Sequence, residues 1–240
     1  MRANRSDVLC LQELKLETNK FPHEMFAALG YHAAVYGQKT YNGVAIIVKN
    51  TLPEFADVQM GVPGFEDEQC RAIAATVGDV RVIDLYVVNG QAVDSDKFQY
   101  KLRWLDAVSA WLAEERAKHS KLVVVGDFNI APTDADVHDP AAWAGQVLCT
   151  DQERAAFNHW LSLGLVDCFR KFEHPPKTFT WWDYRMLAFP KNNGLRIDHI
   201  LATPPLADTC TACVVDRNER KGNAENRPSD HAPVTATFAV

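Results

Sequence analysis

Short apolar segments rich in β-branched residues recur along this chain and are separated by polar turns. They span residues 8–11, 42–48, 71–77, 80–88, 122–125, 178–182, 196–202 and 233–238. Segments of this length and composition are typical of β-strands. The longest helical pattern, with apolar residues on one face and charges on the other, runs from Phe98 to Lys118, and a partly helical stretch follows at 141–163. Many strands with few helices predict an α/β (α+β) fold in which helices cover mixed sheets.

The chain has 240 residues, of which 47% are hydrophobic and 23% are charged, so it is long enough to bury a sizeable core. It contains no Ser/Gly-rich or Pro-rich stretch that would act as a linker. We therefore expect a single domain over residues 1–240. The first apolar segment begins at Val8, after only a few polar residues, which is unusually early for a strand of the core.

The formal net charge is −6, from 31 acidic and 25 basic residues. This balance argues against a protein that holds nucleic acid by bulk electrostatics, because such domains usually have a basic face. It does not exclude an enzyme whose acidic residues surround a metal ion, since a bound cation reverses the local field. Contacts with a phosphate-containing substrate are therefore expected to be local.

The six cysteines include one C-x-x-C pair, Cys210 and Cys213, with no second pair and no histidine cluster near it in sequence. Reduced, buried thiols are favoured over a redox pair or half of a zinc site. The sequence also lacks a membrane-spanning apolar run and a signal-peptide pattern. These features predict a soluble, cytoplasmic protein.

Acidic and amide side chains follow apolar segments, or interrupt them, at four places. The residues are Glu13, Asp127 with Asn129, Asp198, and Asp230 with His231. One carboxylate in an apolar segment is usually a structural group satisfied by hydrogen bonds, but four at strand ends favour a shared site. Carboxylates bind Mg²⁺ and orient water, and histidine and asparagine stabilise charge that develops on a phosphate. The set predicts metal-assisted phosphoryl transfer.

The local spacing supports this interpretation. Asp127 and Asn129 are two residues apart, so on an extended chain their side chains point to the same side. Asp230 and His231 are adjacent, and nearby prolines favour a loop in which both side chains can turn toward one site.

Five segments of the chain follow one another in a characteristic order. They are Leu11-Gln12-Glu13-Leu14-Lys15, Tyr41-Asn42-Gly43-Val44-Ala45, Gly126-Asp127-Phe128-Asn129-Ile130, Gly194-Leu195-Arg196-Ile197-Asp198 and Ser229-Asp230-His231-Ala232-Pro233. The series resembles the exonuclease III family, bacterial AP endonucleases and exonucleases of the endonuclease/exonuclease/phosphatase fold, from about Asp7 to the C-terminus. The resemblance implies a four-layer sandwich of two mixed sheets flanked by helices. It also implies a monomer that cleaves double-stranded DNA at abasic sites or 3′ ends with Mg²⁺, for which Mn²⁺ can substitute.

The resemblance implies a role for each residue of the acidic set. Glu13 is expected to be the principal metal ligand, and Asp127 to orient or activate the attacking water. Asp198 is expected to orient His231, which contacts the phosphate opposite the nucleophile. The implied metal-side group is Glu13, Asp127, Asn129, Asp230 and His231, with Asn129 also stabilising the transition state.

Three more residues enter through the resemblance. A tyrosine at a strand end is more often part of the core, but Tyr86 matches the family's active-site tyrosine, whose phenol could contact the scissile phosphate. Asn89 is expected to bind phosphate in the same turn, although Val88 stands where the family usually has proline. Of two adjacent tryptophans, Trp181 is expected to stack on DNA; core packing is the expectation for the other.

Family members begin with a further strand and helix before the segment that starts at Asp7, and this chain has neither. We therefore expect the domain to be incomplete at its N-terminus, with reduced stability and weak activity. Two alternatives stay open: a phosphatase of the same superfamily, and a catalytically impaired, truncated remnant that still binds DNA. The sequence also leaves open the balance between exonuclease and abasic-site cleavage, which depends on the loops at 138–149 and 181–193.

Overall fold

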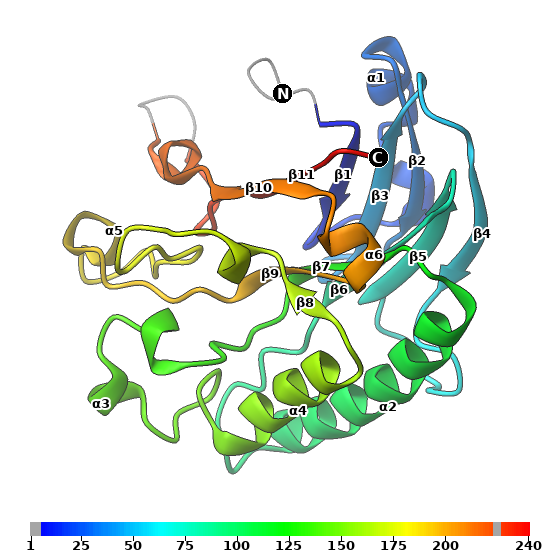
Figure 1. Cartoon of the computed structure of the whole chain (residues 1–240). Helices are drawn as coiled ribbons and strands as arrows, with labels where there is room; N and C mark the ends of the chain where they lie inside the picture. Colours follow the sequence, from blue (N-terminus) through cyan, green and yellow to red (C-terminus); the bar gives the residue numbers. More distant parts are fainter. Residues whose placement is uncertain (1–5, 223–226) are drawn as a thin grey trace.

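The computed structural model describes residues 6–222 and 227–240. Their strands form three sheets, stacked in two layers, with helices on the outer sides (Figure 1). The predicted α/β sandwich is confirmed. No helix in the described part of the chain is both long and apolar enough to cross a membrane.

The larger layer is a six-stranded mixed sheet with the strand order β4-β5-β6-β7-β9-β8. The strands are β4 (Phe55–Met60), β5 (Ala72–Val77), β6 (Val80–Tyr86), β7 (Leu122–Asp127), β8 (Val166–Asp167) and β9 (Asp198–Ala202). β6 and β7 are parallel and the other neighbours are antiparallel. A parallel pair needs a long crossover connection, and α2 (Asp96–Lys118) provides it.

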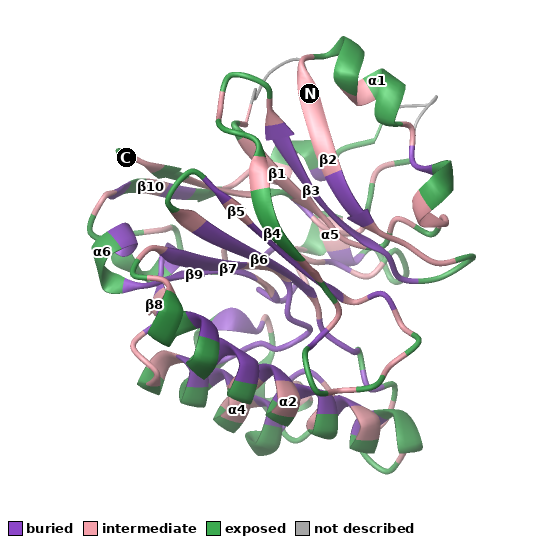
Figure 2. Ribbon diagram, turned by 90° about the vertical axis from the view of Figure 1, so that its right-hand side faces the viewer, coloured by how far each residue is buried: buried purple, intermediate pink, exposed green. Residues whose placement is uncertain are grey.

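Two helices, α2 and α4 (Asp151–Ser162), cover the outer face of this sheet, with their buried sides toward it and their exposed sides toward solvent (Figure 2). Side chains of α2 such as Trp104, Leu105 and Val108 join the apolar core of the sheet. Both helices are capped: Ser95 accepts a hydrogen bond from the N–H of Phe98, and Thr150 forms a capping box that begins α4. The long helical pattern predicted from the sequence is therefore α2.

The second layer, called the upper layer below, consists of two smaller antiparallel sheets (Figure 1). One has the order β1-β3-β2 and the other pairs β10 with β11. The strands are β1 (Val8–Leu11), β2 (Tyr31–Tyr36), β3 (Val44–Lys49), β10 (Cys210–Val215) and β11 (Val234–Phe238). A second apolar cluster fills the space between the layers, and α1 (His23–Ala28) lies on the outer side of the three-stranded sheet. The order is thus helix, sheet, sheet, helix.

Each of the two small sheets has an edge without a ladder partner. Among the described residues β1 pairs only with β3, and β11 pairs only with β10. β1 lies against β7, and β11 lies against β9. β7 and β9 are neighbours in the large sheet. The two free edges are therefore in the same region of the upper layer. The expectation that the domain is incomplete at its N-terminus stays a prediction.

The strand boundaries differ from the sequence expectations in a few places. β2, β4, β8 and β10 were not expected. β8 has only two residues, and β4 is an exposed edge strand with an irregular register, so it shows little apolar alternation. The segment at 178–182 is not a strand, because only Trp181 forms bridges, to Leu195 and His231. The remaining short helices are α3 (Pro140–Trp143), α5 (Ala188–Lys191) and α6 (Pro204–Ala207), with 3₁₀ turns at Thr18–Lys20, Asp134–Asp136, Phe169–Lys171 and Arg217–Arg220.

Candidate active site

Three of the expected site residues stand in a row across neighbouring strands of the large sheet. Tyr86 at the end of β6 is in register with Asp127 at the end of β7, which is in register with Asp198 at the start of β9. The row exists because parallel strands end at the same edge of a sheet, and the antiparallel β9 begins there. Three segments far apart in sequence therefore place polar side chains at one rim.

Gly126 allows β7 to reach this rim beside β6. Its φ is +130°, and a Cβ at this position would lie 2.0 Å from the carbonyl oxygen of Leu85. Only glycine tolerates such a close approach between backbones. The close approach of the Leu85 carbonyl thus explains why glycine precedes Asp127, which the apolar pattern of the strand does not.

Asp127 and Asn129 are bound to one another, as their spacing predicts. The N–H of Asn129 donates to Asp127 Oδ1 at 2.9 Å, and its amide Nδ2 donates to Asp127 Oδ2, also at 2.9 Å. Asn129 has a left-handed backbone with a φ of +48°, and it is buried with Asp127. Its amide oxygen accepts a hydrogen bond from Asn89 Nδ2 at 3.0 Å. The two asparagines and the aspartate form a continuous array.

His231 completes the row from the opposite side. Its Nδ1 lies 3.0 Å and 2.9 Å from the two carboxylate oxygens of Asp198, and its Nε2 lies 3.9 Å from Asp127 Oδ2. Burial alone would lower the pKa of His231, but the charges of Asp198 and Asp127 outweigh it and raise the pKa to about 10. The ring is therefore cationic at neutral pH. Asp198 is thus bound to Nδ1 of this ring, and its orienting role in a reaction stays a prediction.

Burial of Asp127 has the opposite effect on its own carboxyl group. Desolvation, opposed by the charge of His231 and reinforced by the charge of Asp198, raises the pKa of Asp127 to about 7. A carboxyl group with this pKa is matched to proton exchange near neutral pH. The two groups that face each other across 3.9 Å thus have pKa values shifted in a way that is common at active sites.

Glu13 reaches the site from the upper layer, just after β1. It has a left-handed backbone with a φ of +55° and an exposed side chain. The hydroxyl of Tyr86 donates to Glu13 Oε1, and Lys15 Nζ lies 2.9 Å from Glu13 Oε2. Partial burial acts to raise the pKa of Glu13, but these two partners outweigh it and lower the pKa. Glu13 is therefore ionised at neutral pH.

Asp230 and Trp181 meet at the side of the row. Trp181 Nε1 donates to Asp230 Oδ2 at 3.0 Å. The ring of Trp181 is half-buried against an apolar cluster that includes Leu148 and Leu195. Trp182 is fully buried, as core packing requires. The structure thus places Asp230 and Trp181 beside the row. Stacking of Trp181 on DNA stays a prediction.

A metal ion would find two kinds of ligand here. Among the described residues, ligand atoms of Asp127, Asp198 and His231 lie within 4.8 Å of one another. However, Nδ1 of His231 is already bound to Asp198, and Mg²⁺ prefers oxygen ligands. The ionised Glu13 and the buried Asp127 influence each other electrostatically. Carboxylate oxygens are donors that suit a hard cation, and the predicted ligand set of Glu13, Asp127, Asn129, Asp230 and His231 stays a prediction.

Some residues of the site were not singled out from the sequence. Lys15 pairs with Glu13, and the guanidinium of Arg71 lies over the ring of Tyr86, 4.8 Å from its centroid. Lys101, fully buried in α2, donates to the carbonyls of Asn89 and Asn129. Lys15 lies in one of the five motif segments but was given no role there, and Arg71 and Lys101 belong to none of these segments. Only the turn of the chain after Glu13 or the register between distant elements brings them to the rim.

The comparisons with known proteins show the family of the chain. The Endonuclease/Exonuclease/phosphatase family matches residues 1–231. The chain belongs to this family. Exodeoxyribonuclease III of Haemophilus influenzae is 35% identical to this chain, over 97% of the chain and 90% of that protein. The resemblance to the exonuclease III group is therefore confirmed, and the protein is an enzyme of the exodeoxyribonuclease III and AP endonuclease type.

Two solved structures extend the similarity to the whole fold of this family member. A variant of the 3′ phosphatase NExo from Neisseria, bound to a product DNA hairpin, superposes with a TM-score of 0.94 and 46% identity, covering 100% of this chain and 91% of that one. An AP endonuclease from Archaeoglobus fulgidus has a TM-score of 0.92 and 38% identity with the same coverage. The four-layer arrangement is thus the fold of these enzymes.

Proposed function

We propose that this protein is a Mg²⁺-dependent phosphodiesterase that hydrolyses DNA at 3′ ends and abasic sites. The observation that carries the proposal is the pairing of a cationic His231 with a buried Asp127 across 3.9 Å, held in register with Tyr86 and Asp198. An exodeoxyribonuclease III that is 35% identical and a DNA-bound 3′ phosphatase that is 46% identical support it.

Each residue of the row has a task in the proposed reaction. His231, kept protonated by Asp198, attracts a phosphate oxygen and stabilises the charge that develops on it. Asp127 takes a proton from the attacking water, and Asn129 holds its carboxylate in one orientation. When bound, Mg²⁺ would supply further charge neutralisation, and Glu13 and Asp127 would hold it, with Asp230 beside them. Tyr86 keeps Glu13 in place and presents its phenol to the phosphate.

The region beside the row favours 3′ ends over internal abasic sites. An enzyme that recognises a damaged nucleotide within a duplex can turn that nucleotide out of the stack and into a pocket. Leu148, only 5% exposed, fills the apolar space beside Trp181 together with Leu195 and Ile197. We expect a strand end to reach the rim without entering this space. We therefore propose 3′-end processing as the main activity.

The test uses two labelled duplexes, one with a recessed 3′ end and one with an internal abasic site, each with Mg²⁺ and with EDTA. We expect Mg²⁺-dependent cleavage, faster on the recessed end, and a loss of about 10²–10³-fold or more in Asp127→Asn. Asp79→Asn is the matched control. Asp79 is exposed in the turn between β5 and β6, at the end of β6 that lies away from Tyr86 and the site.

Two results would contradict the proposal. Phosphate release from inositol phosphates without any cleavage of DNA would favour a phosphatase of the same family. DNA binding without a metal-dependent product would favour a non-catalytic remnant. Monomeric state and cytoplasmic location stay predictions.

A further inference from the structure

The ammonium group of Lys101 lies directly behind the two loops that carry the amides of the site. Lys101 belongs to α2 and is 0% exposed. Its Nζ donates to the main-chain carbonyls of Asn89 at 3.1 Å and Asn129 at 2.8 Å. The third donor goes to Glu153 of α4, which is also 0% exposed. All three N–H groups are therefore used, and two of them hold loop carbonyls.

The same two loops face the site with their side chains. Asn89 Nδ2 donates to Asn129 Oδ1 at 3.0 Å, and Asn129 Nδ2 donates to Asp127 Oδ2 at 2.9 Å. Asn129 also has a φ of +48°, a backbone conformation that persists in a residue other than glycine when its surroundings hold it. The carbonyls bound by Lys101 belong to the residues whose amides form this array. The position of the array thus depends on contacts from behind.

Glu153 fixes Lys101 in turn. Its carboxylate accepts from the N–H of Leu148 at 3.0 Å, the N–H of Thr150 at 3.0 Å and the hydroxyl of Thr150 at 2.7 Å. The ion pair therefore joins α2, α4 and the loops after β6 and β7. A buried ion pair generally adds little stability over an apolar pair of the same size. We attribute the role of the Lys101–Glu153 pair here to the single arrangement that it imposes on these loops.

We propose that Lys101 is a positioning residue for phosphodiester cleavage, which holds the Asn89, Asn129 and Asp127 array in its productive geometry. The proposal rests on the proposed function, since the array matters for catalysis only if it acts on a phosphate. Without the ammonium group the two carbonyls lose their common donor and the amides shift. A displacement of about 1 Å lowers a rate by about 10²-fold. The loss falls on kcat, because the array contacts the transition state.

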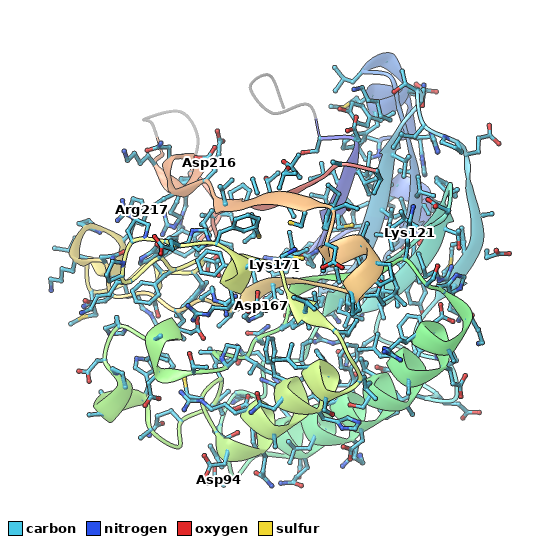
Figure 3. All side chains as sticks on the ribbon, in the orientation of Figure 1. Asp94, Lys121, Asp167, Lys171, Asp216 and Arg217 are labelled. Atoms are coloured by element: carbon cyan, nitrogen blue, oxygen red, sulfur yellow. The ribbon has the colours of Figure 1, made fainter. Side chains whose placement is uncertain are left out.

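The variant to test is Lys101→Met, with Arg81→Met as the matched control. Arg81 forms another buried ion pair with the same helix, to Glu115 at 2.6 Å, with side-chain exposures of 4% and 7%. Glu115 lies about 20 Å from Lys101 along α2. The helix begins after the loop that contains Asp94 and ends before the loop that contains Lys121 (Figure 3). Each variant removes the cation of a buried ion pair, but only Lys101 contacts residues of the site.

With Mg²⁺ and a recessed 3′ end, we expect kcat of Lys101→Met to fall about tenfold or more while KM changes less than about threefold. Arg81→Met should keep kcat within about threefold. Both are measured well below their melting temperatures. An equal loss of kcat in the two variants would show that Lys101 is only structural. If Lys101→Met does not fold, Lys101→Met/Glu153→Gln replaces it, because that double variant leaves no unpaired buried charge.

A second measurement does not depend on activity. The side-chain amide NMR signals of Asn89 and Asn129, recorded without metal, should shift in the Lys101 variant and not in Arg81→Met. Unchanged amide signals would overturn the positioning role. If the wild-type chain does not cleave DNA, the proposed function fails, and the amide signals alone still decide whether Lys101 positions the array.

Discussion

His231 and Asp198 form the pair whose charge state is easiest to measure. In metal-free protein we expect the His231 pKa to be about 10. In Asp198→Asn it should fall toward the ordinary value near 6.5, because the neutral amide no longer favours the cation. Ring-proton NMR titration in EDTA measures both values. A His231 pKa near 6.5 in the unchanged chain would contradict the proposed phosphate contact.

The same shift has a consequence for stability. A histidine pKa raised in the folded state stabilises that state fully below the unfolded pKa of about 6.5, and the contribution is lost as pH rises through about 10. The melting temperature of the metal-free chain should therefore fall more steeply between these pH values than that of Asp198→Asn. Parallel melting curves against pH would show that the pair does not act in this way.

Leu148 tests the preference for strand ends. It has a φ of +77° and fills the apolar space beside Trp181, so Leu148→Gly suits the backbone and empties the space. We expect the ratio of abasic-site cleavage to 3′-end cleavage to rise by about tenfold, measured on the two duplexes. Leu52→Ala, a truncation in another apolar cluster, is the control for lost stability. An unchanged ratio would mean that this space does not set the preference.

At the scale of elements, Gly126 controls how β6 and β7 meet. Gly126→Ala would place a Cβ 2.0 Å from the Leu85 carbonyl, so we expect a loss of roughly 3 kcal/mol or more in the free energy of unfolding. Gly30→Ala is the matched control: its φ is +84°, and nothing lies within 4 Å of the added atom. That change should cost about 1–2 kcal/mol from the backbone alone. Urea unfolding of both variants measures the difference, and equal losses would contradict the argument.

The elements that the sequence predicts best are those with a clear apolar pattern. β3, β5, β7 and α2 lie close to their expected positions because both faces of these strands are buried and the helix has one apolar side. β4 escaped because an exposed edge strand keeps few apolar residues. The strand expected at 80–88 ends at Tyr86, because the chain leaves the ladder there to form the loop that Lys101 holds.

The site shows the same division. Asp127 and Asn129 were predictable because their pairing is local. Glu13 follows β1, Asp198 begins β9 and His231 lies shortly before β11, so each could be placed near a strand end. Lys101 and Arg71 were not predictable, since their roles depend on which helix or strand lies behind the loops. Site residues that interact over short distances in sequence can thus be predicted from the sequence, whereas the residues that hold them in position depend on the tertiary structure.

For the whole molecule, two features of the described residues lower stability: the free edges of β1 and β11, and a buried carboxyl group. Asp84 lies between the layers, bound to Gln12 at 2.5 Å, and burial raises its pKa. Its Oδ2 is buried without a hydrogen-bond partner in the described part of the chain. Unpaired strand edges and buried polar atoms of this kind lower stability. The packing between the layers at this point therefore leaves one carboxyl oxygen unsatisfied among the described residues.

A metal ion at the site would join the two layers, because Glu13 follows β1 of the upper layer and Asp127 ends β7 of the large sheet. An ion that binds only the folded chain stabilises it by mass action, by about 2.7 kcal/mol at 100 times its dissociation constant. For a chain of this length that corresponds to a rise of roughly 5–10 °C in melting temperature. The rise should appear with Mg²⁺ against EDTA in calorimetry, persist in Glu24→Gln on the exposed side of α1, and largely disappear in Glu13→Gln. A full rise in Glu13→Gln would show that the cation is held within one layer, and that Glu13 serves the site through Tyr86 alone.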